Sequence, residues 1–291
     1  MLAHAVFHLP GWHFHLEVWL LVASLFAAYA LAVSRIGPKY VEPGRPVVTR
    51  FQVTCWCLGL LAMWLAADYP IHDVAEQSMY SVHMVQHLLL SMVSAPLLLL
   101  GTPGWLARCV LRPPSMRFRL VRRLSRFFPA LFVFNAVLVF THWPAVVDAS
   151  LRSGWTHFGL HTLVFGSALV VWMPVVSPLP EIPRLPTPAR MLFLFAQSFV
   201  PTVPASFLTF GSSPLYKAYI GLPHLWGLST LQDQQIAGLI MKIGGGLLLW
   251  MLIAVMFFRW AAEEERRQQP RIRRELEREL NELTKMQSEG T

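Results

Sequence analysis

The chain has 291 residues, of which 55% are hydrophobic and only 14% are charged, and its mean hydropathy is +0.47. Soluble domains carry about 25% charged residues, so this composition excludes an ordinary soluble domain and indicates an integral membrane protein. Three cysteines are too few for a disulfide framework, and the net charge of +8 is compatible with nucleic acid or a membrane surface as the partner.

The N-terminal segment, residues 1–16, contains no Lys or Arg. A secretory signal begins with a basic region, so we do not expect one here. The segment holds His4, His8, His13 and His15, which precede the first apolar run and are expected to bind metal loosely at most. We assign residues 1–16 to an outer N-terminal segment.

Apolar runs of about 17–25 residues follow, each as long as a helix needs to be to cross a bilayer. They predict an all-α transmembrane domain of seven helices over residues 17–260. Cys55 and Cys57 lie in the second run and point to different helix faces, so we interpret them as small buried hydrophobic residues. The seven runs lie near residues 17–33, 50–68, 81–100, 129–147, 155–176, 190–210 and 234–258.

Basic residues are concentrated in alternate connections between these runs. Residues 34–50, 101–128 and 177–190 and the tail from Arg259 hold 21 of the 24 Lys and Arg. The positive-inside rule therefore places the N-terminus outside and the C-terminus in the cytoplasm. Topology and contact with anionic lipid account for the net charge, and we do not expect nucleic acid as a partner.

Histidines gather at the outer ends of the third, fourth and fifth runs. The segments "HMVQH" and "HFGLH" each place two histidines four residues apart, on one helix face. At 1.5 Å per residue these pairs reach roughly 10 Å below the helix ends, close to the depth of the fourth-run histidine. Polar side chains inside a membrane usually face the bundle interior and mark a functional site. We predict a metal-binding layer made of His83, His87, His142, His157, His161 and Met84, whereas His72 and His224 are interpreted as ordinary loop residues.

The later part of the chain carries several Pro and Gly signals. The connection "PLPEIPRLPTPAR" (residues 178–190) predicts a stiff strap. Pro201 and Pro204 predict a kink in the sixth run, and "GGG" at 244–246 favours close helix packing in the seventh. Residues 261–291 predict a charged cytoplasmic helical tail. Within this tail, Pro270 suits the start of a helix. A narrow apolar stripe on that tail is formed by Ile272, Leu276, Leu280 and Leu283.

The type of ligand has three interpretations. Imidazole binds Zn, Cu, Fe and Ni, and the thioether of Met84 favours Cu(I), so copper is the first. Axial histidines from facing helices could instead hold a b-type haem in a membrane redox protein. A metal transporter is the third, but the inner halves of the third to fifth runs are apolar apart from Asn135. No catalytic triad, phosphate-binding loop or pair of catalytic carboxylates occurs in a plausible setting, so we do not predict an enzyme.

Several motifs resemble the seven-span CtaG-type (Caa3_CtaG) cytochrome c oxidase assembly factor family over roughly residues 15–260. They are "YSVHMVQHLLLSMVSAPLLLLGTP", "FTHWPAVVDASL", "HFGLHTLVF", "PLPEIPRLPTPARMLFLF" and "LQDQQIAGLIMKIGGG". The resemblance implies a bacterial cytoplasmic-membrane protein that helps to build haem–copper oxidase, by delivering copper to oxidase subunits or their copper chaperones. The family's motif histidines map onto His83, His87, His142 and His161, with His157 one turn before. The chain departs from the family pattern at Lys242, where an aromatic residue is expected.

Overall fold

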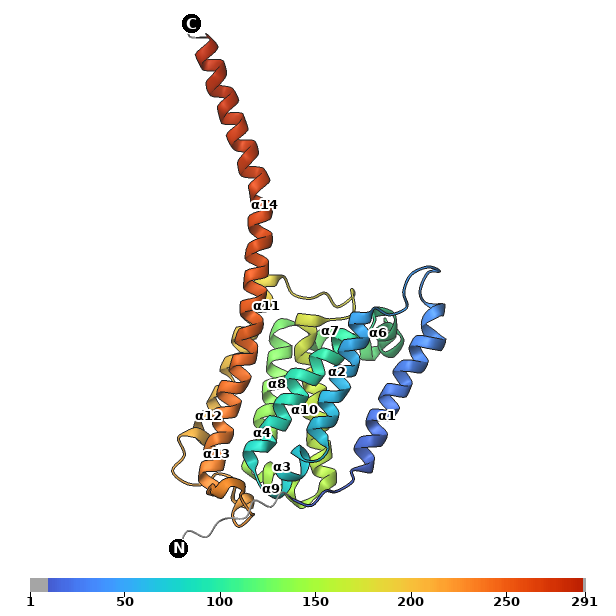
Figure 1. Cartoon of the computed structure of the whole chain (residues 1–291), viewed down its shortest axis with the longest axis vertical. Helices are drawn as coiled ribbons and strands as arrows, with labels where there is room; N and C mark the ends of the chain where they lie inside the picture. Colours follow the sequence, from blue (N-terminus) through green and yellow to red (C-terminus); the bar gives the residue numbers. More distant parts are fainter. Residues whose placement is uncertain (1–9, 290–291) are drawn as a thin grey trace.

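The computed structural model describes residues 10–289, and this part of the chain is helical without any strand. It contains six helices that are long and apolar enough to cross a membrane, or seven if a helix pair bent by 89° counts as one span. The helices run side by side as a bundle (Figure 1). The predicted all-α membrane bundle is therefore confirmed, with six to seven spans.

The spans are built from helices that often continue through a π-helical turn. Such turns are residues Ala32–Ile36 after α1, Leu89–Ser94 between α4 and α5, and Ile240–Gly244 between α13 and α14. The α-helices are α1 (Leu16–Leu31), α2 (Arg50–Ala67), α3 (Ile71–Gln77), α4 (Tyr80–Leu88), α5 (Ala95–Gly101), α6 (Gly104–Leu111), α7 (Met116–Leu124), α8 (Phe127–Thr141), α9 (Pro144–Arg152), α10 (Gly154–Val176), α11 (Thr187–Phe199), α12 (Thr202–Thr209), α13 (Thr230–Leu239) and α14 (Gly245–Glu289).

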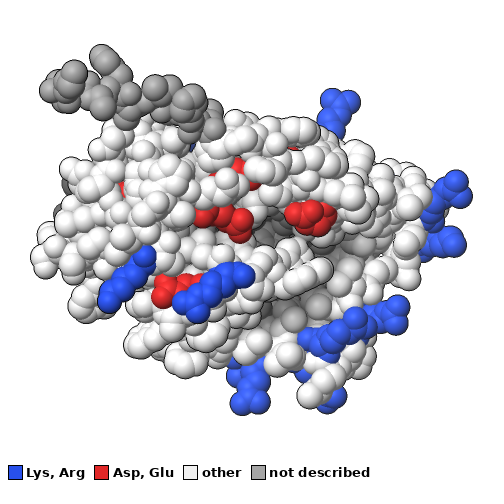
Figure 2. Space-filling model, turned by 90° about the horizontal axis from the view of Figure 1, so that it is seen from below, with Lys and Arg blue, Asp and Glu red and all other residues white. Residues whose placement is uncertain are grey.

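The two ends of the bundle differ in character. One end carries α3, α9 and the loop 210–229, and we call it the histidine end (Figure 1). The opposite end carries α6, α7 and the Pro-rich strap, and we call it the arginine end. Figure 2 shows the histidine end, where acidic side chains gather near the middle of the face and most of the basic ones in view lie toward its edges.

The main core lies between α5, α8, α10 and α11. Ala95, Ala130 and Ala168 are fully buried, and such small residues let helices approach closely in a membrane. Phe134 and Trp172 fill the space between them, and the Trp172 indole donates a hydrogen bond of 2.8 Å to the Ser91 carbonyl. This bond gives the buried indole N–H an acceptor in the π-helical turn Leu89–Ser94.

The strap closes the arginine end. Between Ser177 and Pro186 the chain is not helical, and Leu179 and Ile182 are buried against a cluster beneath α6 and α7. Arg108 of α6 donates to the Glu181 carboxylate at 2.7 Å, and this interaction lowers the pKa of Glu181 below its ordinary value. The Pro-rich connection thus forms a strap, as predicted.

Two predicted spans have boundaries that differ from the structure. The fourth was predicted over residues 129–147, but α8 ends at Thr141 and α9 begins at Pro144. A proline inside a helix removes one backbone hydrogen bond, whereas the first helical position does not need its N–H group. Pro144 therefore begins a new helix. The sixth was predicted over 190–210, and it breaks between α11 and α12 at Pro201, which is where the kink was expected.

The tail does not begin a new helix at Pro270, and that prediction is wrong. Helix α14 runs without interruption from Gly245 to Glu289 and leaves the bundle at the arginine end (Figure 1). A proline inside a helix removes one backbone hydrogen bond, but strong helix formers such as Glu, Arg and Leu continue on both sides of it. The boundary predicted at residue 261 is therefore not marked by a break in secondary structure.

Candidate metal centre

Helix α4, which carries two of the predicted ligands, is held at its N-terminus by a carboxylate from another span. The backbone N–H groups of Tyr80 and Ser81 donate to Asp233 of α13 at 2.7 and 3.1 Å. Asp233 is fully buried. The first N–H groups of a helix have no partner within the helix, and they carry partial positive charge that a carboxylate stabilises. Asp233 therefore fixes the start of the helix that presents His83 and His87.

The next residue of the same motif positions a third predicted ligand. The Gln234 side-chain oxygen accepts from the backbone N–H groups of Leu215 and Tyr216, and its amide donates to the Tyr216 carbonyl. The Tyr216 hydroxyl in turn donates to the His142 carbonyl at 2.9 Å. Burial raises the pKa of Tyr216 to about 12, so this hydroxyl keeps its proton and remains a donor at neutral pH.

The five predicted histidines lie together at the histidine end. They come from α4, from the residue that follows α8, and from α10. His87 is central in one part of the group, with ring centroids 5.2 Å from His142, 4.9 Å from His161 and 4.4 Å from His83. His157 lies 4.2 Å from His161 and 5.7 Å from His83. We call His83, His87, His142, His157 and His161 the imidazole cluster.

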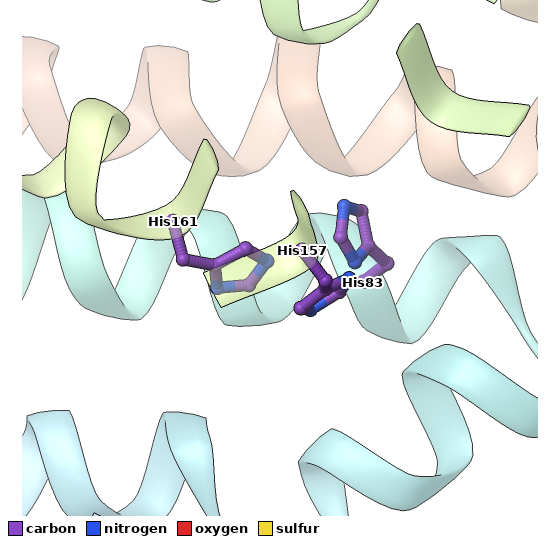
Figure 3. Close-up of side chains that lie close together, drawn as sticks. All are labelled: His83, His157 and His161. Carbon is purple, nitrogen blue, oxygen red and sulfur yellow. The ribbon is translucent and has the colours of Figure 1, made fainter. Parts of the chain in front are cut away.

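Three members of the cluster are close enough to share one ion. One ring nitrogen each from His83, His157 and His161 lies within 4.8 Å of the others. Figure 3 shows the rings of these residues gathered between α4 and α10. Zn²⁺ and copper are commonly bound by imidazole nitrogens at about 2 Å, so a small closure of this trio would bring all three nitrogens to a central ion.

The cluster contains ring nitrogens that are buried without a hydrogen-bond partner. A buried polar atom left unpaired costs about 1–3 kcal/mol, so several such atoms in one place mark a candidate ligand site. The His142 Nδ1–H donates to the Leu138 carbonyl at 2.7 Å, which leaves the lone pair on Nε2. The unpartnered atoms are Nδ1 of His83, Nε2 of His87, Nε2 of His142, both ring nitrogens of His157, and Nε2 of His161.

Met84, the predicted thioether ligand, lies beside the cluster and not within the trio. It is buried in an apolar group with Tyr80, Tyr216 and Met241. Together with His87 and His142 it also lines a cavity of about 50 Å³ that extends toward the middle of the bundle. Met84 therefore shares a cavity with His87 and His142, which have unpartnered nitrogens of their own.

His72 is not an ordinary loop residue, as it was predicted to be. It lies on α3, and its ring centroid is 5.5 Å from that of His157 and 4.7 Å from that of His15. The sequence signal was present, because "HDVAE" places His72 and Glu76 four residues apart on a short helix. His224 hydrogen-bonds the Leu222 carbonyl in its own loop.

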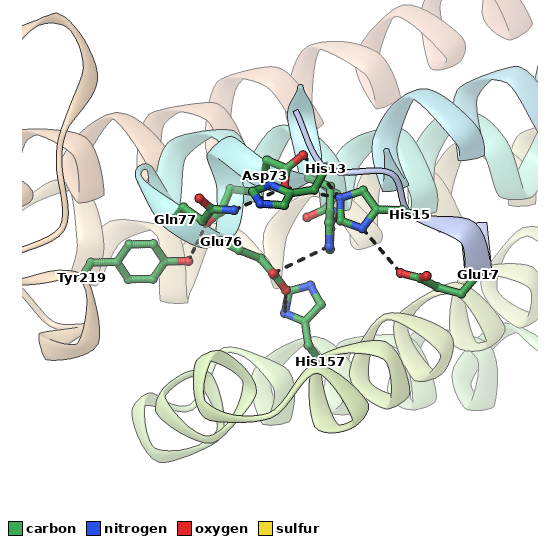
Figure 4. Close-up of polar contacts among 11 residues, drawn as sticks. His13, His15, Glu17, Asp73, Glu76, Gln77, His157 and Tyr219 are labelled. Atoms are coloured by element: carbon green, nitrogen blue, oxygen red, sulfur yellow. Dashed lines mark hydrogen bonds and ion pairs between the residues drawn. The ribbon is translucent and has the colours of Figure 1, made fainter. Parts of the chain in front are cut away.

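The N-terminal histidines divide into two pairs. His13 and His15 lie over α3, where both approach the buried carboxylate of Asp73 at 3.5 and 3.3 Å (Figure 4). The prediction for His4 and His8 concerns residues that lie outside the described part of the chain. The N-terminal segment is thus attached to the histidine end through imidazole–carboxylate contacts.

Lys242 lies on the exposed surface of the seventh span, where its ammonium group faces an aromatic ring. It is exposed, and its ammonium lies 5.7 Å above the ring of Phe210. Asp233 of the same span is not paired with it but accepts hydrogen bonds from the α4 amides. The adjacent Gly244 and Gly245 face Leu88 of α4, where an added Cβ would lie 3.3 Å from a Leu88 methyl group, so these glycines permit the close packing of the seventh span on the third.

Replacing Asp233 with alanine is expected to destabilise the protein. The substitution leaves two buried amides of α4 without an acceptor, and hydrogen bonds to charged groups are each worth about 1.5–3 kcal/mol. We expect the free energy of unfolding to fall by about 3–5 kcal/mol. The measurement is the unfolding midpoint of the purified protein in detergent, which should be lower than that of wild type. Asp233→Asn keeps one acceptor oxygen and should lose less. Equal midpoints for wild type and Asp233→Ala would contradict the anchoring role.

Comparison with known proteins identifies relatives of this chain. Two uncharacterized proteins, from Mycobacterium bovis and Mycobacterium tuberculosis, are each 28% identical to it over 228 residues. The match covers 72% of this chain and 34% of each relative, so the chain spans about a third of the length of these curated relatives. No solved structure matches the chain. The family model described as the cytochrome c oxidase caa3 assembly factor (Caa3_CtaG) matches residues 27–263, and the chain therefore belongs to this family.

Proposed function

We propose that this protein binds copper through the imidazole cluster and delivers it during assembly of haem–copper cytochrome c oxidase. The single observation that carries the proposal is the set of unpartnered, buried ring nitrogens in the cluster, in a chain of a family described as oxidase assembly factors. The ion is cargo, and the protein needs no catalytic turnover of its own. The proposed partners are oxidase subunits or their copper chaperones.

The size of the space around the cluster supports a bare ion over haem. Pockets for drug-sized ligands and cofactors are roughly 300–1,000 Å³, whereas the cavity lined by His87 and His142 is about 50 Å³. In addition, the rings are already in contact with one another, as the His157–His161 centroid distance of 4.2 Å illustrates. A porphyrin between these rings would require the helices to separate.

The surroundings of the cluster support delivery at one face over transport across the membrane. Below the cluster, Gln197 and Asn135 pair with each other at 3.0 Å and satisfy their own polar groups. Beyond them, the described core toward the arginine end consists of apolar residues such as Ala130 and Trp172. An ion that left the cluster in that direction would lose its ligands, so release back toward the histidine end is favoured.

The protein's own residues divide the work between binding and positioning. The imidazole cluster supplies neutral nitrogen ligands, and Met84 beside His87 and His142 offers a soft donor to copper in its reduced form. Asp233 holds α4, and Tyr216 holds the backbone of His142. Asp233 belongs to the "LQDQQ" motif, and Gln234 of the same motif holds the Tyr216 backbone, so the motif serves the cluster without contacting the ion.

Metal analysis of the purified full-length protein tests this proposal. After growth in copper-containing medium, we expect copper in the detergent-purified protein and no Soret band in its visible spectrum. Copper content below that of an unrelated membrane protein prepared in parallel would refute copper binding. A haem spectrum that scaled with protein concentration would instead favour the redox alternative.

We also propose that the histidine end faces outward from the bacterial cytoplasmic membrane. The concentration of basic residues in alternate connections supports this orientation. Reporter fusions at residues 75 and 220 are then expected to give outside signals, and fusions at 115 and 275 inside signals. Signals of the opposite sense at all four positions would place the cluster at the cytoplasmic face and exclude copper handling from outside.

A further inference from the structure

A second group of metal-binding side chains lies between the imidazole cluster and the surface of the histidine end. His72 and Glu76 are one turn apart on α3, and Glu76 points toward His157 of α10 (Figure 4). The ring centroid of His72 lies 5.5 Å from that of His157. Glu76 Oε1 lies 3.2 Å from His157 Nδ1, and Glu76 Oε2 lies 3.7 Å from His72 Nε2. One donor atom from each residue lies within 4.8 Å of the other two.

The donor set of this group differs from that of the cluster. Two imidazoles and one carboxylate suit a divalent ion such as Zn²⁺, Co²⁺ or Cu²⁺, whereas a hard carboxylate is a poor ligand for Cu(I). We propose that His72, Glu76 and His157 form an outer site that accepts a divalent cation and passes it to the imidazole cluster through His157. The transfer step rests on the proposed function, but the existence of the outer site does not.

The surroundings orient the outer group toward an ion. The Gln86 side-chain amide lies 3.1 Å from His72 Nδ1, and its buried oxygen has no hydrogen-bond partner. With the amide turned so that this oxygen accepts from Nδ1–H, the lone pair of His72 is on Nε2, which lies 3.7 Å from Glu76. His157 Nδ1 is buried and has no hydrogen bond, although the Glu76 carboxylate is near it. A cation bound between them would coordinate both the carboxylate and the nitrogen, in place of their 3.2 Å contact with each other.

A graded path of imidazoles connects this site to the surface. His13 is 62% exposed, His15 is 15% exposed, and His157 is only 5% exposed. The ring of His15 lies 4.7 Å from that of His72, so an ion can exchange ligands from one ring to the next. The buried carboxylate of Asp73, which His15 contacts, adds negative charge that attracts a cation to this path.

His157 belongs to both groups and therefore couples them. It is close to His72 and Glu76 on one side and to His83 and His161 on the other. A neutral imidazole has one lone pair for metal binding, so His157 completes only one of the two sites at a time. An ion moves inward when the His157 ring turns with the ion bound, so that His72 and Glu76 are replaced by His83 and His161. The ion stays divalent throughout, so the exchange itself transfers no electron.

Titration with Co²⁺ in the purified full-length protein tests the outer site. Its visible absorption reports coordination, and Zn²⁺ competition confirms that binding is reversible. We expect Glu76→Gln and His72→Ala to weaken Co²⁺ binding at least about tenfold, since even partners of metal ligands change affinity by roughly 10–100-fold. Glu17→Gln is the matched control, because Glu17 lies 3.4 Å from His15 but is outside the donor set. His161→Ala should retain Co²⁺ binding.

The outcomes separate this inference from the proposed function. Unchanged Co²⁺ affinity in Glu76→Gln and His72→Ala, with unfolding midpoints equal to wild type, would overturn the outer site. Loss of Co²⁺ binding in His161→Ala alone would do the same, because the ion would then belong to the cluster. Copper bound under reducing conditions is measured in the same proteins. If no copper is bound under reducing conditions while Co²⁺ binding depends on Glu76, the proposed function fails and the outer site stands.

Discussion

Replacing His83 and His87 together with alanine is expected to abolish stable copper binding by the purified protein. These residues are the two α4 members of the imidazole cluster, and their ring centroids lie 5.4 and 4.9 Å from that of His161 of α10. Removing a direct ligand should weaken copper affinity by at least about 100-fold, the upper end of what partners of ligands achieve. Copper per protein, measured after gel filtration, checks this expectation. His161→Ala should give the same result from the opposite helix.

The control for these variants is His224→Ala. His224 bonds the Leu222 carbonyl in its own loop, so its removal should leave copper content near the wild-type value. His224 lies in the loop 210–229, outside the imidazole cluster, so it supplies no ligand to an ion held there. Equal copper content in wild type, His83→Ala/His87→Ala, His161→Ala and His224→Ala would refute the imidazole cluster as the copper site. Unfolding midpoints of all variants show whether any loss reflects misfolding.

A strain that lacks this protein is expected to contain oxidase polypeptide with deficient copper and severalfold lower activity per unit of oxidase. Under the proposed function, the protein supplies the ion and does no turnover chemistry of its own. Added copper should restore part of the activity, because mass action loads a site slowly without a carrier. The measurement is oxidase activity per oxidase protein in isolated membranes, with and without copper in the medium.

Two complementing variants sharpen this experiment. The His83→Ala/His87→Ala protein should behave like the deletion, because a carrier without ligands carries nothing. Removal of residues 265–291 should have a milder effect, since α14 leaves the bundle at the arginine end, opposite the cluster (Figure 1). Normal specific activity in the deletion strain would end the assembly proposal. A haem signal that disappears with the protein would favour the redox alternative.

Some features of the site depend only on local sequence, and these were predicted. The i and i+4 spacing in "HMVQH" and "HFGLH" places each histidine pair on one helix face wherever the helix packs. The apolar runs predicted the helical membrane bundle because a bilayer requires long apolar segments with all backbone groups paired. The position of Pro201 predicted the break between α11 and α12, because proline lacks the N–H that the ladder needs.

Other features depend on which segments meet in space, and sequence spacing did not reveal them. Asp233 caps a helix more than 150 residues away in the chain, and a capping signature can be read only when cap and helix are adjacent. His72 was assigned to a loop because its run is short and polar. Its importance appears only when α3 folds back over α10 and brings Glu76 to His157.

The sequence by itself determined the membrane class, the helical architecture and the two histidine pairs, because each follows from periodicity or composition within about 20 residues. Tertiary structure alone decided that Met84 lies beside the trio and that Asp233 of α13 holds the start of α4. It also decided that His157 serves two donor groups. These outcomes are set by contacts between distant segments, where packing and the pairing of buried polar groups override local preference.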